Sequence, residues 1–302
     1  LTRSSAASDV YKRQIYLYEH AAKEDKRKNL ANVRSGEYEG LEKKIKSKNW
    51  EPDFGKEFNK KSGATAIGVR DFLIAYNINL NTKSTRLANA IAFDVREKGR
   101  IKRKGHPVIG EIVYDKDGNP ETIPGSLLHV KAIGWYIEEF GIAQISMNLT
   151  NITETPIHIV FEEVAKKANA RGASVTGSEL VGLIPLKSMI DAGKYFLEKQ
   201  NRSIGIPEED IIKIAIDSLG LNQVKVFDPD KNIIEYYLDK ITNKNGNLID
   251  LSSRSFSDEV SRETPAPGGG SVSSYVGALG TSLAGMVANL SCNTRGWENK
   301  VK

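Results

Sequence analysis

Residues 66–80 read AIGVRDFLIAYNINL, and the side chains of this stretch alternate with a period of two. Such alternation is typical of a β-strand whose two faces meet different surroundings. One face of the predicted strand carries mostly large apolar side chains, namely Phe72, Ile74, Tyr76, Ile78 and Leu80. The other face carries Leu73, Ala75, Asn77 and Asn79. We therefore expect one continuous strand here, at the start of the main domain.

The stretches that follow predict the rest of this domain. Asn81 or Thr82 is placed to cap a helix that reaches Gly99, and DKDGNP (115–120) predicts a small hairpin. Further elements are a strand at 127–139, a strand at 142–150, a helix at 156–171 and a strand at 173–182. The order βαββαβ indicates an α+β fold of the ferredoxin-like kind. In such a unit both helices cover one sheet face, and the other face stays free for a partner domain or a ligand.

Beyond this unit the pattern predicts mainly helices. Two helices are expected at 186–200 and 207–220, then a strand at 232–238 and a linker at 242–253. Pro207 stands at the first turn of the second helix and Gly220 directly follows it, which is the usual asymmetry of helix ends.

Composition excludes several classes of protein. A chain of 302 residues has room for about two domains, and a net charge of +5 by itself implies neither nucleic acid nor a membrane surface. The single cysteine, Cys292, excludes an internal disulfide and suits a reducing compartment. The four histidines are scattered, so we predict no metal site: His20, His106, His129 and His158.

The first residues, LTRSSAASDVYKRQ (1–14), carry charges and lack the apolar core of a signal peptide. They resemble translated adapter sequence, so we expect a non-native tail on a chain truncated upstream. The alternative is a disordered native tail.

Polar side chains form a row on the predicted free sheet face: Asn77, Asn79, Gln144, Ser146 and Asn148. Amides offer both donors and acceptors, which suits the edge of a heteroaromatic ring or a carboxylate. The alternative is an ordinary solvated face. An RNA-binding sheet would carry stacking aromatics, and none of these positions is aromatic, so we predict no nucleic-acid partner.

A basic cluster spans residues 96–104 and contains Arg96, Lys98, Arg100, Lys102, Arg103 and Lys104. Such a cluster attracts polyanions. It is also what the C-terminal turn of a helix and a solvated loop ordinarily look like.

The stretch TPAPGGGSVSSYVGALGTSLAGM (264–286) allows several interpretations. A phosphate loop would need a lysine followed by serine or threonine, which is absent here. A membrane span is disfavoured by the polar residues and by the lack of an aromatic belt. The apolar residues follow helical spacing at Val272, Val276, Leu279, Leu283, Met286 and Leu290. We therefore predict the first helix of an all-α domain, whose glycine-rich entry could offer backbone N–H groups to a ligand.

Several stretches together resemble the formimidoyltransferase (formiminotransferase) family: YLYEHAA, VRSGEYEGLEKKI, EPDFG, KSGATAIGVRDFLIAYNINLNT, IGWYIEEFGIAQISMNLTN, GSELVGLIPLKSMIDAG and IIEYYL. FSDEVSRETPAPGGGSV is similar to the opening of the cyclodeaminase domain that follows the transferase in bifunctional members. The resemblance implies the end of the N-subdomain at 15–63, the C-subdomain at 64–241 and the start of a truncated cyclodeaminase domain at 254–302.

The resemblance also implies chemistry. The family transfers the formimino group of N-formimidoyl-L-glutamate to tetrahydrofolate in histidine degradation, and it holds the folate in a tunnel between two subdomains. The cyclodeaminase then forms 5,10-methenyltetrahydrofolate and releases ammonia. A cytoplasmic enzyme that forms homo-oligomers through both domains is implied. The different-class alternative is a non-catalytic folate-binding or assembly module.

The folate-binding segment of the family falls on Gly55, Lys56, Glu57, Phe58, Asn59, Lys60, Lys61, Ser62 and Gly63, and the polar row would complete the site. Folates carry polyglutamate tails, which Arg100, Lys102, Arg103 and Lys104 are placed to hold by charge. The family's general-base histidine matches no position of this chain, so the fragment is expected to be inactive alone. His158 matches a family histidine that we expect to be structural.

Overall fold

The computed structural model describes residues 13–55, 57–106, 109–242 and 248–292. The chain divides into two compact units, residues 1–71 and 72–302. Most of the expected tail at 1–14 lies outside the described residues, as do residues 243–247 of the expected linker at 242–253 and Lys56.

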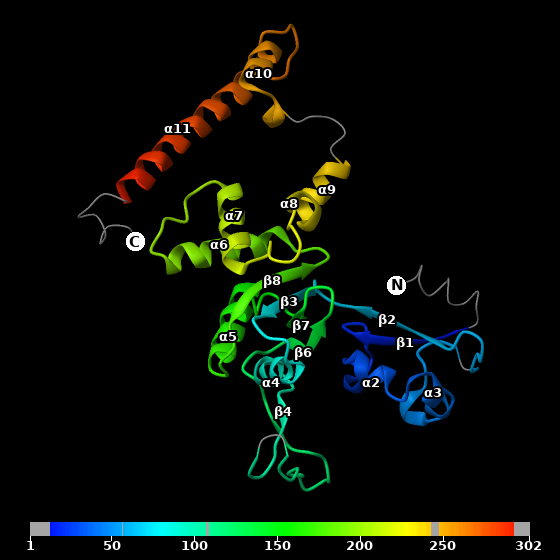
Figure 1. Cartoon of the computed structure of the whole chain (residues 1–302). Helices are drawn as coiled ribbons and strands as arrows, with labels where there is room; N and C mark the ends of the chain where they lie inside the picture. The colour runs from blue at the N-terminus through cyan, green and yellow to red at the C-terminus, as the bar shows by residue number, and fades with distance from the viewer. Residues whose placement is uncertain (1–12, 56, 107–108, 243–247, 293–302) are drawn as a thin grey trace. The chain divides into compact units, whose positions relative to one another are not determined.

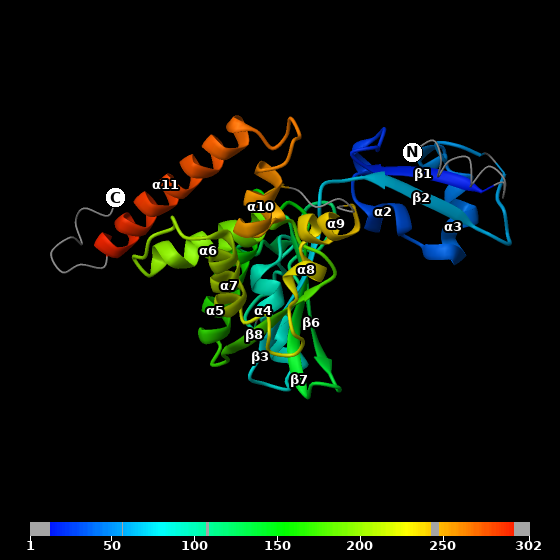
Figure 2. The same ribbon diagram turned by 90° about the horizontal axis from the view of Figure 1, so that it is seen from above.

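The first unit packs two parallel strands against short helices. Its strands are β1 (Gln14–Glu19) and β2 (Ala64–Val69). Its helical segments are η1 (Asp25–Arg27), α2 (Leu30–Arg34), α3 (Glu37–Ile45) and η2 (Lys48–Trp50). Figures 1 and 2 both show α2 and α3 on the same side of the strand pair. Tyr16, Val33 and Ile45 form the small core of this unit.

A buried ion pair fixes the EPDFG segment (51–55). Arg27 Nη1 lies 2.8 Å from Asp53 Oδ2, and the two side chains are 4% and 2% exposed. The same carboxylate oxygen accepts the backbone N–H of Leu17 at 2.8 Å. Removing one member of a buried pair leaves an uncompensated charge, so this pair holds the chain in place just before the 55–63 loop.

The second unit contains a four-stranded antiparallel sheet in the order β6-β7-β3-β8. Its strands are β3 (Ile74–Leu80), β6 (Val130–Ile137), β7 (Ile142–Leu149) and β8 (Val175–Val181). Helix α4 (Thr85–Val95) follows β3, and α5 (Ile157–Asn169) connects β7 to β8. This mixture of helices and an antiparallel sheet is compatible with the α+β class predicted from the sequence.

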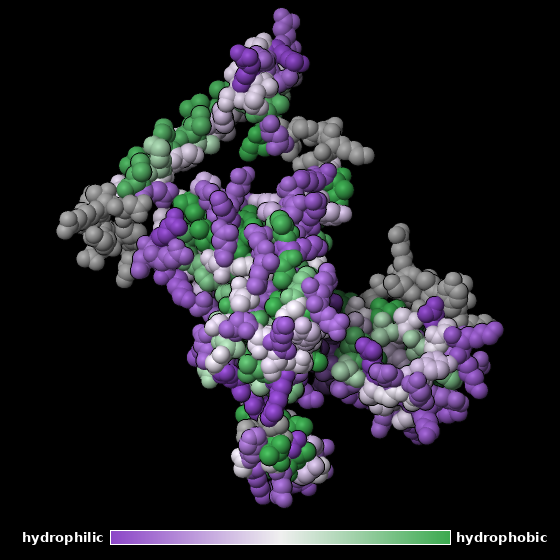
Figure 3. Space-filling model, viewed as in Figure 1, coloured by the Kyte–Doolittle hydropathy of each residue, from purple (hydrophilic) through white to green (hydrophobic). Residues whose placement is uncertain are grey.

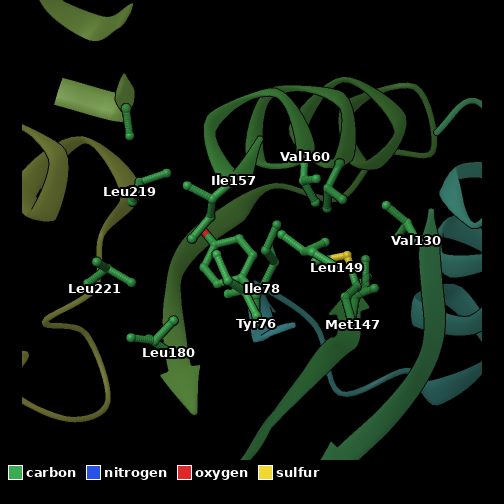
Figure 4. Close-up of a cluster of buried hydrophobic side chains, with 14 of the residues drawn as sticks. Tyr76, Ile78, Val130, Met147, Leu149, Ile157, Val160, Leu180, Leu219 and Leu221 are labelled. Atoms are coloured by element: carbon green, nitrogen blue, oxygen red, sulfur yellow. The ribbon is translucent and has the colours of Figure 1, made fainter. Parts of the chain in front are cut away.

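The core of this unit lies between the sheet and its helices. Tyr76, Ile78, Met147 and Leu149 point from the sheet toward α5 in Figure 4, and all are at most 2% exposed. Each such fully buried apolar side chain contributes roughly 1.5–3 kcal/mol relative to an exposed one. Gly134 lets α4 approach β6, because a Cβ there would lie 2.2 Å from the backbone nitrogen of Asn89.

The prediction of one strand over 66–80 is wrong. Strand β2 ends at Val69, β3 begins at Ile74, and Phe72 between them is 60% exposed. The reason is pairing, because β2 pairs with β1 whereas β3 pairs with β7 and β8. In the sequence, two short strands look like one long strand when the alternation of apolar and polar side chains continues from one to the other without a change of phase.

Two local predictions also need correction. The helix after β3 is capped by Ser84, whose Oγ accepts from the backbone nitrogen of Leu87 at 3.2 Å, and not by Asn81 or Thr82. The strand expected at 232–238 is mostly helix α9 (Ile234–Thr242). Ile233 forms one parallel bridge to Ile184. The pairing cannot extend further, because the chain after Ile184 enters helix α6 at Leu186.

The remaining elements are mainly helical: α6 (Leu186–Lys199), α7 (Glu208–Leu219), α8 (Pro229–Asn232), η3 (Leu248–Asp250), α10 (Ser253–Val260) and α11 (Gly269–Cys292). Helix α7 has the predicted ends, with Pro207 at the N-cap and Gly220 in the left-handed conformation after it. The helix predicted after the triple glycine is α11, whose surface shows many apolar side chains in Figure 3. Among the described helices, none has both the length and the apolar character that crossing a membrane requires.

An arm extends away from the sheet beyond α4 (Figure 1). Its base is the antiparallel pair β4 (Arg100–Ile101) and β5 (Thr122–Ile123). At its turn, Asp115 Oδ1 accepts the backbone N–H groups of Asp117 at 2.9 Å and Asn119 at 2.8 Å. The predicted hairpin at DKDGNP is therefore present.

Candidate functional site

The sheet face opposite the α5 core carries the polar row. Strand register places two lines of neighbouring side chains across all four strands. One line holds Ile133, Ser146, Asn77 and Glu179, and the other holds Trp135, Gln144, Asn79 and Gly177. Neighbours in such a line stand about 5 Å apart, close enough to act together.

Side chains on this face form an amide network, by which we mean Asn77, Asn79, Gln144, Glu179 and Gln223. Gln144 Nε2 donates to Asn79 Oδ1 at 2.6 Å and lies 3.4 Å from Glu179 Oε2. Asn77 Nδ2 donates to the same Glu179 oxygen at 3.2 Å. Asn79 Nδ2 donates to Gln223 Oε1 at 2.7 Å.

Gln223 reaches the network from the segment after α7. Its Nε2 also donates to Thr176 Oγ1 at 2.8 Å, which fixes the side chain at both ends. Gly177 makes this approach possible, because a Cβ there would lie 2.5 Å from Gln223 Oε1. The network is therefore built by strand pairing together with one segment distant in sequence.

The predicted polar row divides into two parts. Asn77, Asn79 and Gln144 are buried within the network, Ser146 is half-buried and Asn148 is exposed. Neither a fully open row nor a plainly solvated face describes this arrangement. The buried part is held rigidly, as groups that must meet a ligand in fixed geometry need to be.

Sequence reasoning missed three residues of this face. Trp135 is 45% exposed beside Gln144, so the face does carry an aromatic ring. The alternation in AIGWYI held that signal, but only the register of β6 against β7 shows which face the ring is on. Glu179 and Gln223 enter through β8 and the segment after α7, and no local pattern marks them.

In the first unit, the predicted folate-binding loop is an ordered turn. Asn59 Oδ1 accepts the backbone N–H groups of Lys61 at 3.0 Å and Ser62 at 3.2 Å. The hydroxyl of Tyr38 donates to the carbonyl of Lys60, and its ring lies 6.3 Å from that of Phe58. Gly55 and Gly63 both have positive φ.

Two of these loop residues line a cavity of about 350 Å³ in this unit, namely Ser62 and Gly63. Its other lining residues include two rings, Tyr16 and Tyr38, and two charged side chains, Arg34 and Glu37. Burial raises the pKa of Tyr16 to about 12, so its hydroxyl stays protonated and donates to the carbonyl of Trp50 at 2.7 Å. Glu57, Lys60 and Lys61 are exposed and do not line the cavity.

The basic cluster is partly neutralised by its own surroundings. Arg100 pairs with Asp94, and Lys102 Nζ lies 2.6 Å from Glu121 Oε2. Arg103 Nη1 donates to the carbonyl of Gly110 at 2.8 Å and has no carboxylate partner among the described residues, and Lys104 is exposed. Arg103 and Lys104 thus keep the charge that a polyanion would meet.

Four arginines, Arg86, Arg96, Arg100 and Arg103, line a cavity of about 550 Å³ between α4 and the arm. The guanidinium carbon of Arg96 lies 4.0 Å from the centre of the Phe93 ring, which also lines the cavity. Burial lowers the pKa of Arg96, and its guanidinium donates to the carbonyl of Gly99 at 2.9 Å. The cavity combines an apolar wall with guanidinium groups that suit carboxylates or phosphates.

Family models match the chain in three consecutive pieces. Residues 3–70 match "Formiminotransferase domain, N-terminal subdomain", and residues 75–239 match "Formiminotransferase domain". Residues 252–302 match "Formiminotransferase-cyclodeaminase". The chain belongs to the formiminotransferase family. The resemblance noted in the sequence is confirmed.

Known members of the formiminotransferase family are similar over most of the chain. Formimidoyltransferase-cyclodeaminase of Dictyostelium discoideum is 43% identical over 90% of this chain and 47% of its own length. The Mus musculus protein of the same name is 40% identical over 94% of this chain and 49% of its own. Glutamate formimidoyltransferase of Thermoplasma acidophilum is 38% identical over 61% of this chain and 53% of its own length. The chain thus spans about half the length of these relatives.

The histidines differ in setting. His158 is 7% exposed and stacks on Tyr195 at 4.6 Å, and burial lowers its pKa. His20 is exposed, 3.7 Å from Asp71. Within the described ranges, no three His, Cys, Asp or Glu side chains are grouped to hold a metal.

Proposed function

We propose that this formiminotransferase-family protein transfers the formimidoyl group of N-formimidoyl-L-glutamate to tetrahydrofolate, and that it does so within a formimidoyltransferase-cyclodeaminase. The main support for this proposal is the order of the three family matches along the chain. Relatives named formimidoyltransferase-cyclodeaminase and glutamate formimidoyltransferase support it as well. The formimidoyl carbon would leave the glutamate nitrogen and bond to N5 of tetrahydrofolate, while a proton moves from N5 to the glutamate nitrogen. Cyclodeaminase chemistry would then form 5,10-methenyltetrahydrofolate and release ammonia.

We propose that the sheet of the second unit is a ferredoxin-like module. The succession β3-α4-β6-β7-α5-β8 and the strand order β6-β7-β3-β8 support this, with the β4–β5 arm as an insertion. The domain boundaries proposed from the sequence are 15–63 and 64–241 for the transferase parts, with a linker at 242–253 and the cyclodeaminase part from 254. The division between the two compact units lies slightly later, between residues 71 and 72, because β2 pairs with β1.

The polar sheet face is our proposed folate-contacting surface in the second unit. Its amide network offers fixed hydrogen-bonding groups to a ring edge, and Trp135 offers a flat apolar surface. In the first unit, the loop at 55–63 is the proposed folate-binding segment, supported by its ordered turn and by the cavity at Ser62 and Gly63.

A polyglutamate tail is the proposed ligand of the basic cluster. Guanidinium groups bind carboxylates in a bidentate way, and the arginine-lined cavity gathers four of them. Arg103 and Lys104 are the stronger candidates, because Arg100 and Lys102 already have carboxylate partners.

The protein is further proposed to act in the cytoplasm and to form homo-oligomers through both domains. Exposed apolar side chains on α11, such as Val276, Leu283 and Leu290, support association. Analytical ultracentrifugation of the chain would measure its oligomeric state.

Calorimetric titration of the chain with tetrahydrofolate tests the folate proposal, which an absence of binding would contradict. Because the family's general-base histidine matches no position of this chain, transfer is tested after the chain is joined to the N-terminal transferase part of a relative that carries this histidine. Release of glutamate from N-formimidoyl-L-glutamate in the presence of tetrahydrofolate would then support the enzyme, and binding with no turnover would favour a folate-binding module. Pentaglutamate and monoglutamate forms test the tail, with Arg103→Gln expected to remove any preference for the longer form. Lys116→Gln, at the exposed turn of the same arm, is the matched control.

A further inference from the structure

Each amide nitrogen of the network donates at least one hydrogen bond. Both described contacts of Gln144 Nε2 are to network acceptors, Asn79 Oδ1 and Glu179 Oε2. Asn77 Nδ2 donates to Glu179 Oε2 as well. Asn79 Nδ2 donates to Gln223 Oε1. Both N–H groups of Gln144 are therefore engaged, whereas Asn77 and Asn79 each use one in the network.

Acceptors, in contrast, are left over. Gln144 is fully buried, and its Oε1 has no hydrogen-bond partner. Glu179 is half-buried, and no Lys, Arg or His of the described chain forms an ion pair with it. Glu179 Oε2 already accepts from Asn77 and Gln144, but among the described residues none donates to Glu179 Oε1. A buried acceptor without a donor costs free energy, and a half-buried carboxylate gains from a cationic donor.

The two acceptors lie together. Gln144 Nε2 is 3.4 Å from Glu179 Oε2, so the Gln144 amide lies beside the carboxylate. On the same face, Ile133 and Trp135 are largely exposed and flank the network on the β6 side. The face therefore combines a half-buried carboxylate, a buried amide oxygen of the neighbouring Gln144 that lacks a donor, and an apolar flank. This combination suits a flat group with N–H donors along one edge.

We propose that Glu179, together with the Oε1 atom of Gln144, is a specificity-determining acceptor pair for an amidine-type edge, meaning a planar group with neighbouring N–H donors. This inference rests on the proposed function, because two molecules in that reaction carry such an edge. One is the formimidoyl group of N-formimidoyl-L-glutamate, which is cationic when protonated and complements the charge of Glu179. The other is the 2-amino-4-oxo edge of tetrahydrofolate.

Paired ligands distinguish the two sources. The whole chain would be titrated calorimetrically with tetrahydrofolate and its 2-desamino analogue, and with N-formimidoyl-L-glutamate and N-formyl-L-glutamate. Each second ligand lacks one of the two neighbouring N–H donors but keeps the rest of the molecule. Loss of a hydrogen bond to a charged acceptor lowers affinity about 10- to 100-fold, so the unmodified chain should prefer the first ligand of one pair by that factor.

Glu179→Gln should abolish that preference, because an amide replaces one acceptor oxygen by a donor. Glu179→Asp keeps the charge and should retain part of the preference. Glu139→Gln makes the same chemical change at an exposed position in the hairpin between β6 and β7 and should have no effect. Circular dichroism of each variant would verify folding.

A preference within the folate pair assigns the edge to the pterin, and a preference within the glutamate pair assigns it to the formimidoyl group. Preferences that survive in Glu179→Gln would overturn the inference. If the unmodified chain binds none of the four ligands, the proposed function fails for this chain, and acetamidinium becomes the probe. Side-chain amide NMR shifts of Gln144 that depend on Glu179 would then support the acceptor pair, and their absence would refute it.

Discussion

On one face of the four-stranded sheet, Ile78 and Met147 lie under α4 and α5 with almost no exposed surface. On the other face, Ile133 and Trp135 remain about half exposed beside a buried amide network. The same strands supply both faces through alternate residues. The first face is held by burial of apolar surface, which is non-directional, and the second by hydrogen bonds, which demand fixed partners. The first therefore provides stability and the second provides geometry.

The largest expected effect is on the apolar face. Ile78→Ala should lower the free energy of unfolding by about 2–5 kcal/mol, because it leaves a cavity in a fully buried site. Ile133→Ala on the opposite face is the matched control and should cost less than about 1 kcal/mol. Urea denaturation measures both. Equal costs would mean that the two faces are not energetically distinct.

The amide network should give the next largest effect. Gln144→Met keeps the length of the side chain but removes the donor to Asn79 and Glu179. Leaving these acceptors unsatisfied should cost about 1–3 kcal/mol, again by urea denaturation. Ser146→Ala, on the same face outside the network, should change stability little. A neutral or stabilising Gln144→Met would show that the network has no net structural value.

A smaller effect on the free energy of unfolding is expected from the protonation of His158 in helix α5. Burial lowers the pKa of His158 below its usual 6.5, with Asp191 and Glu162 acting in the opposite direction. The unfolded chain then binds the proton more readily, so stability is full above pH 6.5 and falls as the pH drops through and below that value. His158→Phe, which can keep the stack on Tyr195, should flatten this dependence in denaturation curves recorded at several pH values. His20→Gln, at an exposed site, should leave the curve unchanged.

The smallest effect on stability is expected from Trp135. Because this side chain is about half exposed, Trp135→Phe should shift the free energy of unfolding by less than about 1 kcal/mol. It should nevertheless weaken tetrahydrofolate binding if the ligand lies on this face, as measured by calorimetry. Tyr136→Phe, on the next residue of β6, is the control. Unchanged affinity in Trp135→Phe would remove the ring from the proposed surface.

Much of the fold could be predicted from local patterns. The strands near 130–137 and 142–149, helix α5 and both ends of α7 follow from alternation, helical spacing and capping residues. The failures arose where pairing decides. The stretch 66–80 divides between two sheets, and 232–238 becomes helical after a single bridge. Neither outcome can be read from the segment itself, since each depends on the partner strand.

The candidate site shows the same division. Asn77, Asn79 and Gln144 were found because their alternation is local, and the sequence by itself determined that Asn77 and Asn79 share a face of one strand. The pairing of β3 with β7 places Gln144 on that same face. Only the tertiary structure placed Glu179, Gln223 and Trp135 beside them, through the register of four strands and a segment after α7. The physical reason is the distance along the chain over which each feature is decided. The direction of a side chain repeats every two residues along a strand, whereas a hydrogen bond between distant segments depends on how the whole chain packs.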